Sequence, residues 1–492
     1  MSSLPDRLRQ HLRDIISLRP QVGLVLGPVA FLTMLWMPTP QGLSDSAWQV
    51  LALTLLMASW WVTEAAPLAV TALLPITLLP LLGIQGIQQA AAPYANPLIF
   101  LFLGGFIIAG AIQRWDLHRR LSLLVLSLSG TRPDRVVAGF MIATAILSMW
   151  VSNTATSALM VPIGLSVLKL LHRDDDTHRD NLSLCLLLGI ALGANIGGMA
   201  TLIGTPPNAL LAGYLRSNHD ITIGFGQWML FALPLSIVLL ALAWHLLTRH
   251  IYPIAHHPID GLSALIHEQR QSLGRMSRPE RLVVTVFTGV ALTWLTRPLL
   301  LNLWPGLGLT DAGIAILGAV ALFVIPIRWR PLTAAMDWEA TKSIPWGVLL
   351  LVGGGLSLGN AIESSGLATA IAAALHGMTG WHFTLVIAVV VATIMGLSHV
   401  TSNTATTATM LPIAASLAVD LNLAVPLLCV PVALAASSAY MLPVATPPNA
   451  IIFSSQLITV PQMVRAGASI SPAALLLITV WTLLFTPLLA GQ

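Results

Sequence analysis

The chain has 492 residues, of which 56% are hydrophobic and only 9% charged, and its mean hydropathy is +0.83. A soluble domain needs roughly a quarter of its residues charged to cover its surface. This composition therefore excludes an ordinary soluble protein and predicts an all-α membrane protein. The net charge of +4 is small for this length and gives no reason to expect a nucleic-acid partner. Cys185 and Cys429 lie in apolar segments and are predicted to be small buried residues.

In chain order, we predict a cytoplasmic N-terminal segment at 1–19 and a first transmembrane helix within 20–45. Apolar runs of roughly 20 residues are long enough to cross the hydrocarbon core. About eleven transmembrane helices follow from such runs, at 20–38, 46–62, 66–84, 98–118, 182–212, 226–248, 282–302, 310–327, 345–373, 424–453 and 468–489. Two of them, 182–212 and 424–453, are expected to be broken by prolines.

The stretch 136–168 is expected to be a re-entrant hairpin. Arg132 and Arg135 precede it and Lys169 follows it, so a single crossing would leave basic residues on both sides. Its 33 residues are too few for two crossings and a turn. With this hairpin, 21 of the 23 Lys and Arg face the cytoplasm, all except Arg216 and Arg297. The pattern predicts a cytoplasmic N-terminus, an external C-terminus and insertion into the inner membrane among its lipids.

The two halves of the chain contain matching motifs. The twelve residues from Ser152 and the twelve from Ser402 share nine identities, and Thr-Pro-Pro-Asn occurs at both 205–208 and 446–449. We divide the chain into a first repeat at 46–250, a cytoplasmic linker at 251–281 and a second repeat at 282–492 with its hairpin at 383–418. Five crossings separate the hairpins, so the second copy is predicted to be inverted, which is typical of secondary transporters. A duplication retained only for packing is the alternative.

The paired motifs favour ion and anion binding. Two successive prolines remove two N–H donors and push the preceding residue out of helical geometry, so carbonyls near Gly204 and Ala445 lose their partners. Such carbonyls could bind Na⁺, although a proline pair can also be a simple kink. The Ser-Asn-Thr residues could cap a helix, contact an anion or do both. Because 343–464 contains no Lys or Arg, bound Na⁺ would have to balance a dianion there.

With the sequence Trp60-Trp61-Val62-Thr63-Glu64-Ala65-Ala66-Pro67, these motifs resemble the divalent anion/sodium symporter family, which includes bacterial dicarboxylate transporters. The resemblance covers nearly the whole chain. It implies a homodimer in which a scaffold domain holds a transport domain that carries both hairpins and both broken helices and moves as an elevator. It further implies a symporter, or co-transporter, that imports a small dicarboxylate with Na⁺ as the co-transported ion.

The resemblance also assigns site residues. Substrate carboxylates would be held by Asn153, Thr154, Asn403 and Thr404, with Thr446 and Pro447 nearby. One sodium site would use Ser148, Ser152, Asn153 and Gly204, and the second Ser398, Thr401, Asn403 and Ala445. Thr404 favours C4-dicarboxylates such as succinate, malate and fumarate, because the sulfate-carrying branch of the family lacks this threonine.

Several alternatives remain open at this level. Many family members have an acidic residue where this chain has His399, and some relatives exchange dicarboxylates without sodium. His399 could respond to pH, but a neutral, hydrogen-bonded histidine is favoured. An anion channel is a rival of another class. An intramembrane enzyme is disfavoured because no HExxH motif or paired acids accompany the motifs. Glu64 is expected to be an interfacial anchor or a helix partner, with no transport role.

Overall fold

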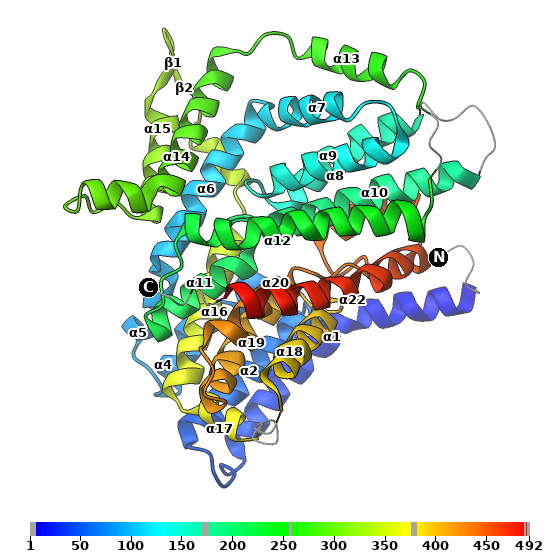
Figure 1. The fold of residues 1–492 in the computed structure, drawn as a ribbon. Coiled ribbons are helices and arrows are strands. Elements are labelled where there is room, and N and C mark those ends of the chain that lie inside the picture. Colours follow the sequence, from blue (N-terminus) through cyan, green and yellow to red (C-terminus); the bar gives the residue numbers. More distant parts are fainter. Residues whose placement is uncertain (1–5, 170–176, 255–257, 375–380, 487–488, 490–492) are drawn as a thin grey trace.

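The protein is described by a computed structural model that covers residues 6–169, 177–254, 258–374, 381–486 and 489. It is almost entirely helical, and its only described strands form a short hairpin (Figure 1). The elements before the first hairpin are α1 (Asp6–Trp36), α2 (Asp45–Thr63), α3 (Leu68–Thr71), α4 (Leu74–Leu81), α5 (Ile87–Ala91), η1 (Ala92–Ala95), α6 (Pro97–Arg114) and α7 (Leu117–Ser129).

Next come α8 (Pro133–Ser148), α9 (Asn153–Lys169), α10 (Thr177–Gly198), α11 (Pro206–His219), α12 (Phe225–His245), η2 (Leu246–Ile251), α13 (Leu262–Ser272), α14 (Arg278–Leu303) and α15 (Asp311–Val324). The rest are β1 (Pro326–Trp329), β2 (Leu332–Ala334), η3 (Glu339–Ser343), α16 (Trp346–Ser364), α17 (Leu367–Ala374), α18 (Phe383–Ser398), α19 (Asn403–Asp420), α20 (Pro426–Ala436), α21 (Pro447–Ser454) and α22 (Val460–Phe485). The two strands pair antiparallel.

The duplicated motifs lie in a duplicated series of helices. The series α6 to α12 is repeated in order by α16 to α22, including the predicted hairpins α8–α9 and α18–α19. The junctions match in detail, because Asp116 and Gly366, 250 positions apart, both have positive φ between a long helix and the short helix that follows it. The duplication therefore extends from the motifs to the backbone.

The helices most deeply buried are those that carry the breaks. In the apolar stretch of α10, 89% of the residues are buried inside the protein, whereas in that of α14 only 17% are. A Cβ atom at Gly193 would lie 2.7 Å from the Met141 carbonyl oxygen, and one at Gly197 2.4 Å from the Ala145 Cα. Glycines one turn apart thus let the α10 and α8 backbones approach closely, as in other helix pairs within membranes. Cys185 on α10 and Cys429 on α20 are buried and unpaired with each other, as predicted.

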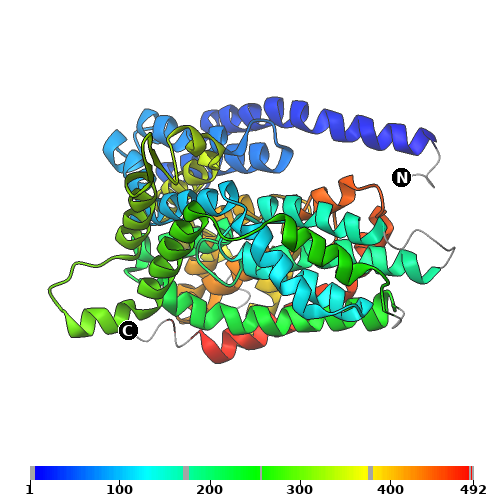
Figure 2. The same ribbon diagram turned by 90° about the horizontal axis from the view of Figure 1, so that it is seen from above.

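Apolar side chains cover much of the outer surface. Leu24, Val25 and Leu26 on α1 and Leu299 on α14 are each more than half exposed. Figure 2 shows α1 along one edge of the molecule, and α1 packs against α2. Exposed apolar surface on this scale is expected where lipid is the solvent.

The number of crossings stays a prediction. By length and composition, seven helical stretches among the described residues could cross a membrane, and five further apolar helices are shorter. The segments predicted at 66–84 and 345–373 are each divided, into α3 and α4 and into α16 and α17. At the N-terminus, α1 runs without a break through the predicted junction between residues 19 and 20.

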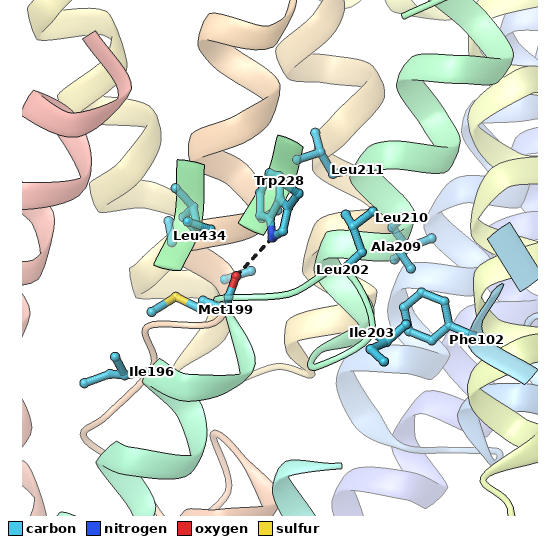
Figure 3. Packing of buried hydrophobic residues seen from close by; sticks show 14 of the residues in the cluster. Phe102, Ile196, Met199, Leu202, Ile203, Ala209, Leu210, Leu211, Trp228 and Leu434 are labelled. Atoms are coloured by element: carbon cyan, nitrogen blue, oxygen red, sulfur yellow. Dashed lines mark hydrogen bonds between the residues drawn. The ribbon is translucent and has the colours of Figure 1, made fainter. Parts of the chain in front are cut away.

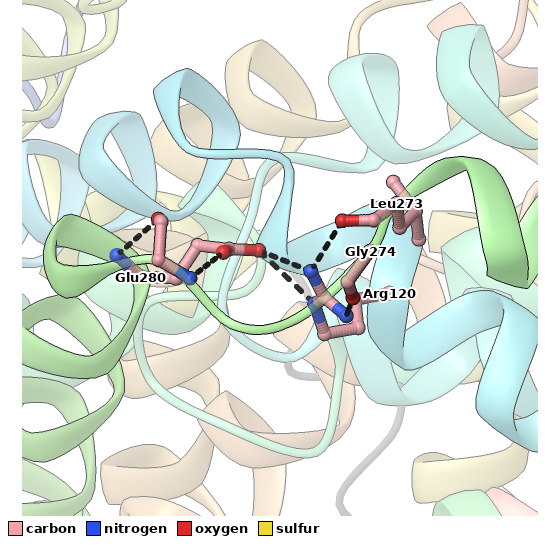
Figure 4. Close-up of polar contacts among 5 residues, drawn as sticks. Arg120, Leu273, Gly274 and Glu280 are labelled. Atoms are coloured by element: carbon pink, nitrogen blue, oxygen red, sulfur yellow. Dashed lines mark hydrogen bonds and ion pairs between the residues drawn. The ribbon is translucent and has the colours of Figure 1, made fainter.

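The linker is attached to the first repeat by a charged pair. Arg120 on α7 donates from Nε and Nη2 to Glu280 Oε1, at 3.0 and 2.8 Å, and also reaches the carbonyls of Leu273 and Gly274 (Figure 4). Glu280 in turn accepts the backbone N–H of Ser277, which begins α14 with a capping box. This contact joins the linker and the start of α14 to the first repeat.

Candidate functional site

One cavity of about 870 Å³ receives both Ser-Asn-Thr motifs and both Thr-Pro-Pro motifs. All six predicted substrate-binding residues line it: Asn153, Thr154, Asn403, Thr404, Thr446 and Pro447. Of the predicted sodium ligands, Ser152, Gly204, Thr401 and Ala445 also line it, whereas Ser148 and Ser398 lie fully buried behind its wall. We call it the central cavity. The structure thus brings together residues that are some 250 positions apart in sequence.

Each proline pair begins a new helix after an irregular segment. The prolines occupy the first positions of α11 and α21, where a missing N–H costs no hydrogen bond. The asparagine of each motif then bonds to the irregular segment. Asn208 Nδ2 donates to the Met199 and Thr201 carbonyls, and Asn449 Nδ2 to the Ala439 and Leu442 carbonyls, at 2.8 to 3.3 Å. The Thr-Pro-Pro-Asn pattern alone indicated no role for these asparagines, but they hold both breaks in shape.

A cluster of oxygen atoms surrounds the side-chain amide of Asn153. The amide lies 2.5 Å from Ser148 Oγ and 3.2 Å from the carbonyl oxygens of both Ala194 and Gly204. With its nitrogen facing these oxygens, the amide donates to them. With its oxygen facing them, the cluster would need a cation. Ligands at right angles, each about 2.4 Å from a hard cation, are roughly 3.4 Å apart, which is close to the two 3.2 Å spacings, whereas the 2.5 Å spacing between Ser148 Oγ and the amide is that of a hydrogen bond.

Glycines make the cluster possible. A Cβ at Gly198 would lie 2.5 Å from Asn153 Oδ1, and one at Gly204 would lie 2.4 Å from the Gly198 carbonyl oxygen. Both distances are shorter than any real carbon contact, so larger residues would force the amide or the break to move. The first predicted sodium site therefore depends on Gly198, which the sequence analysis did not single out.

The corresponding residues of the second repeat have unpaired oxygens. Ser398 Oγ and Asn403 Oδ1 are buried and have no hydrogen-bond partner among the described residues. Buried polar atoms without partners are rare and call for a ligand or another cause. The Thr401 hydroxyl, in contrast, already bonds to the Leu397 carbonyl and to Thr406 Oγ1. Two of the four residues predicted for the second sodium site, Ser398 and Asn403, thus have oxygens without a partner, and Ala445 lines the cavity wall.

Four helices begin at the central cavity. The first residues of α9, α11, α19 and α21 line it, so four positive helix ends face its space. Because α11 and α21 start with two prolines each, the N–H donors available to an anion come from α9 and α19. Ser152 also caps α9 by accepting from the Ala155 N–H at 3.3 Å. Capping and ligand binding are thus compatible in this motif.

The cavity has little charge of its own. Among the described residues that line it, Glu64 is the only one with an ionisable side chain, and no lysine or arginine is present. Glu64 follows α2 in a left-handed conformation that turns the chain toward α3. Its position in the cavity wall was missed, because the sequence analysis placed Glu64 only at a membrane end.

Asn195 connects the two repeats beside the oxygen cluster. Its side chain, 1% exposed, donates to Thr446 Oγ1 at 3.1 Å and to Asn449 Oδ1 at 3.5 Å. Its neighbour Ala194 supplies a carbonyl to the Asn153 cluster. The equivalent position in the second repeat, ten residues before Thr446, is Ala436, so this link exists only once.

His399 lies in the turn between α18 and α19. Its Nδ1 is bonded to the Met395 carbonyl, its Nε2 has no partner among the described residues, and the residue is 7% exposed. This arrangement fits the expected hydrogen-bonded histidine beside the site. His399 does not itself line the central cavity.

Comparisons with known proteins agree with this arrangement. The model of the sodium:sulfate symporter transmembrane region matches residues 20–491. The sodium-dependent dicarboxylate transporter SdcS of Staphylococcus saprophyticus is 40% identical over 477 residues, covering 96% of this chain and 92% of the relative. SdcS of Staphylococcus aureus is 41% identical with the same coverage.

Two solved structures share the fold at low sequence identity. The Alcanivorax borkumensis YdaH transporter aligns with a TM-score of 0.58 at 15% identity, covering 88% of this chain and 98% of that one. Neisseria gonorrhoeae MtrF aligns with a TM-score of 0.58 at 14% identity, covering 95% and 94%. At this identity, the likeness concerns the fold alone.

Replacing Gly198 with alanine tests the first cation cluster. We expect Gly198→Ala to weaken Na⁺ binding about tenfold or more, because losing one well-placed ligand costs at least about 1.4 kcal/mol. Binding of ²²Na⁺ to the purified protein measures the effect. Gly289→Ala on α14 is the control, since nothing lies within 4 Å of its added Cβ. Equal Na⁺ affinity in both variants would contradict the assignment.

Replacing Asn195 with leucine tests the link between the repeats. The variant keeps the volume but removes the donor to Asn449 Oδ1 and one of the two donors to Thr446 Oγ1, which still accepts the Asn449 N–H. We therefore expect stability to fall by about 1–3 kcal/mol and the Na⁺ dependence of transport to shift to higher concentration. Ser438→Ala is the control, because Ser438 Oγ makes a buried contact with Met199 across the same boundary. A variant with unchanged Na⁺ dependence would show that Asn195 only packs.

Proposed function

The chain belongs to the sodium:sulfate symporter family, and on that premise we propose that it is a secondary transporter that moves small dicarboxylates together with Na⁺. The observation that carries this proposal is the central cavity, where both polar motifs and both helix breaks meet without a lysine or arginine. The 40–41% identical relatives are named sodium-dependent dicarboxylate transporters, which supports Na⁺ as the co-transported ion. The predicted family and function are thereby confirmed.

The central cavity could bind a dianion through the positive partial charges of the helix N-termini and through bound Na⁺ ions. The N-termini of α9 and α19 contribute roughly 0.3–1 kcal/mol each when exposed, and up to about 2 kcal/mol when partly buried. Asn153, Thr154, Asn403 and Thr404 would orient the carboxylates. Na⁺ at the two oxygen clusters would cancel the charge of the dianion, so substrate and cation binding would each depend on the other.

Neither rival class is favoured. The named relatives and the family are transporters, so the chain is a transporter and not an enzyme. Within the described part of the chain, no group of three His, Cys, Asp or Glu side chains could hold a catalytic metal. An anion channel would equilibrate its ion and would not need cation ligands next to the anion site.

The substrate class is proposed more finely from Thr404. It lines the cavity together with Thr154, which has the matching position in the first motif. Two threonine hydroxyls and two amides offer donors to both ends of a short diacid, which supports succinate, malate or fumarate over sulfate.

The chain is a multi-pass membrane transporter, and the bacterial relatives imply the inner membrane. We propose the finer features: eleven crossings, an inverted repeat, re-entrant hairpins α8–α9 and α18–α19, an internal N-terminus and an external C-terminus. The central cavity reaches Glu64, Gln113 and Ser343, which the charge pattern assigns to the cytoplasmic side. In this orientation the cavity opens inward.

The same cavity lies between two groups of helices, which supports an elevator. One wall comes from α6, α16 and the end of α2, and the other from the hairpins and broken helices. Movement of the second group against the first would carry the site across the membrane. A homodimer built on the first group is part of this proposal and rests on the family resemblance.

Uptake of labelled succinate into substrate-free proteoliposomes tests the function. An inward Na⁺ gradient should drive accumulation above equilibrium, and choline in place of Na⁺ should abolish it. Asn403→Ala should reduce the rate by about a hundredfold, because one substrate and one cation contact are lost together. Asn302→Ala is the matched control, since Asn302 is exposed on α14 away from the cavity.

The outcome also separates the open alternatives. Uptake that strictly requires internal dicarboxylate, with or without Na⁺, would establish exchange in place of symport. Equilibration without accumulation under a Na⁺ gradient would indicate a channel. Either result, obtained with protein that is folded and correctly inserted, would contradict the proposal.

A further inference from the structure

A second cavity lies at the N-terminal end of α6, whereas the central cavity lies at its C-terminal end, near Gln113. The second cavity has a volume of about 370 Å³ and is lined by the start of α6, the end of α11, the late part of α14 and the start of α15. Both arginines that the charge pattern placed outside, Arg216 and Arg297, line it, although they are 81 residues apart. We call it the Arg216 cavity.

The two arginines are in different electrostatic states. Arg297 Nη1 lies 3.2 Å from Asp311 Oδ1, and its Nε donates to the Leu309 carbonyl. Asp311 Oδ2 also accepts the N–H of Phe225, and the Arg297–Asp311 pair carries no net charge. Arg216 is exposed in the cavity wall and has no ion-pair partner among the described residues. The cavity therefore has one uncompensated positive charge.

A position in the last turn of a helix would by itself favour an arginine. The helix dipole does not explain, however, why Arg216 lies in the wall of a concave space. Arg216 lines the same concave space as the paired Arg297 and the hydroxyl-bearing residues Thr222 and Thr310, and this space is large enough for a small organic anion. A cation in a concave, low-dielectric wall attracts anions more strongly than one on a flat surface.

The two cavities share helix α6. Leu98 and Leu101 face the Arg216 cavity, and Phe106, Ala109 and Gln113 face the central cavity. The rise from Leu101 to Ala109 is roughly 12 Å at 1.5 Å per residue. Between them, Ile203 from the first break lies against α6 next to Phe102 (Figure 3), and both side chains are at most 5% exposed. An apolar barrier thus separates the two spaces in this conformation.

We propose that the Arg216 cavity is an external recruitment site for dicarboxylates, which gathers them where the central cavity opens to the outside once movement of the broken helices against α6 has separated Ile203 from Phe102. This inference rests on the proposed function and on the predicted orientation. Arg216 can attract the dianion from outside the central cavity. A permanently charged side chain inside the central cavity would bind the dianion without Na⁺ and would remove the coupling. The site would raise the local concentration of external substrate and leave release inside unaffected.

Sided transport measurements with Arg216→Gln test the proposal. In vesicles of phosphatidylcholine, which carry no net lipid charge, we expect the KM for external succinate to rise about three- to tenfold at low ionic strength. The KM for internal succinate, measured by efflux, should change less than about twofold. Because screening shortens the Debye length to about 3 Å at 1 M salt, the external defect should disappear there. Arg216→Lys should restore most of the affinity.

Two further measurements make the test decisive. Arg275→Gln removes an exposed charge from the predicted cytoplasmic side and should change neither sided KM. In the unaltered protein, salt should raise the external KM more than the internal one, which tests the site even if Arg216→Gln fails to fold. Equal sided effects, or none, while the unaltered protein transports succinate, would overturn this inference without affecting the proposed function. Absence of any dicarboxylate transport would overturn both.

Discussion

The proposed function imposes one electrostatic constraint on the structure: a doubly charged anion would have to be held inside a membrane protein by a cavity with no basic side chain among its described lining residues. Removing such an ion from water costs many kcal/mol unless its charge is balanced nearby. The chain meets this constraint with helix ends and oxygen clusters. Four helices begin at the cavity, and the breaks that create two of them also free the carbonyls that a cation requires. The proposed substrate and cation sites would thus be made by the same irregular backbone.

The irregular backbone is itself stabilised by a few asparagine hydrogen bonds and by a glycine. Asn208 and Asn449 donate to carbonyls of the irregular segments that precede the proline pairs, at equivalent positions in the two repeats. Gly198 leaves space for the Asn153 amide. Asn195 occurs in only one repeat and connects the two breaks. The two repeats thus share the asparagine that stabilises each helix break, but they differ at the position of Asn195, where one repeat contacts the other.

Much of this could be predicted from sequence, because proline chemistry and charge act locally. The turns after Ser148 and Ser398 and the breaks at both Thr-Pro-Pro motifs occur where they were expected. Hydropathy gave no sign of the division between α3 and α4, since every residue near it is apolar or small, whereas the polar run Glu363-Ser364-Ser365-Gly366 at the junction of α16 and α17 was included in one predicted segment. The roles of Glu64, Asn195 and Gly198 could not be inferred either. Each depends on a contact or a shared cavity between distant segments, which a local pattern does not report.

The central claim is that bound cations, and not basic side chains, balance the anion. Succinate binding to the purified protein, measured by calorimetry in Na⁺ and in choline, tests it most directly. We expect succinate to bind at least about tenfold more weakly in choline, and linkage then requires succinate to tighten Na⁺ binding by the same factor. Equal succinate affinity in the two salts would contradict the account.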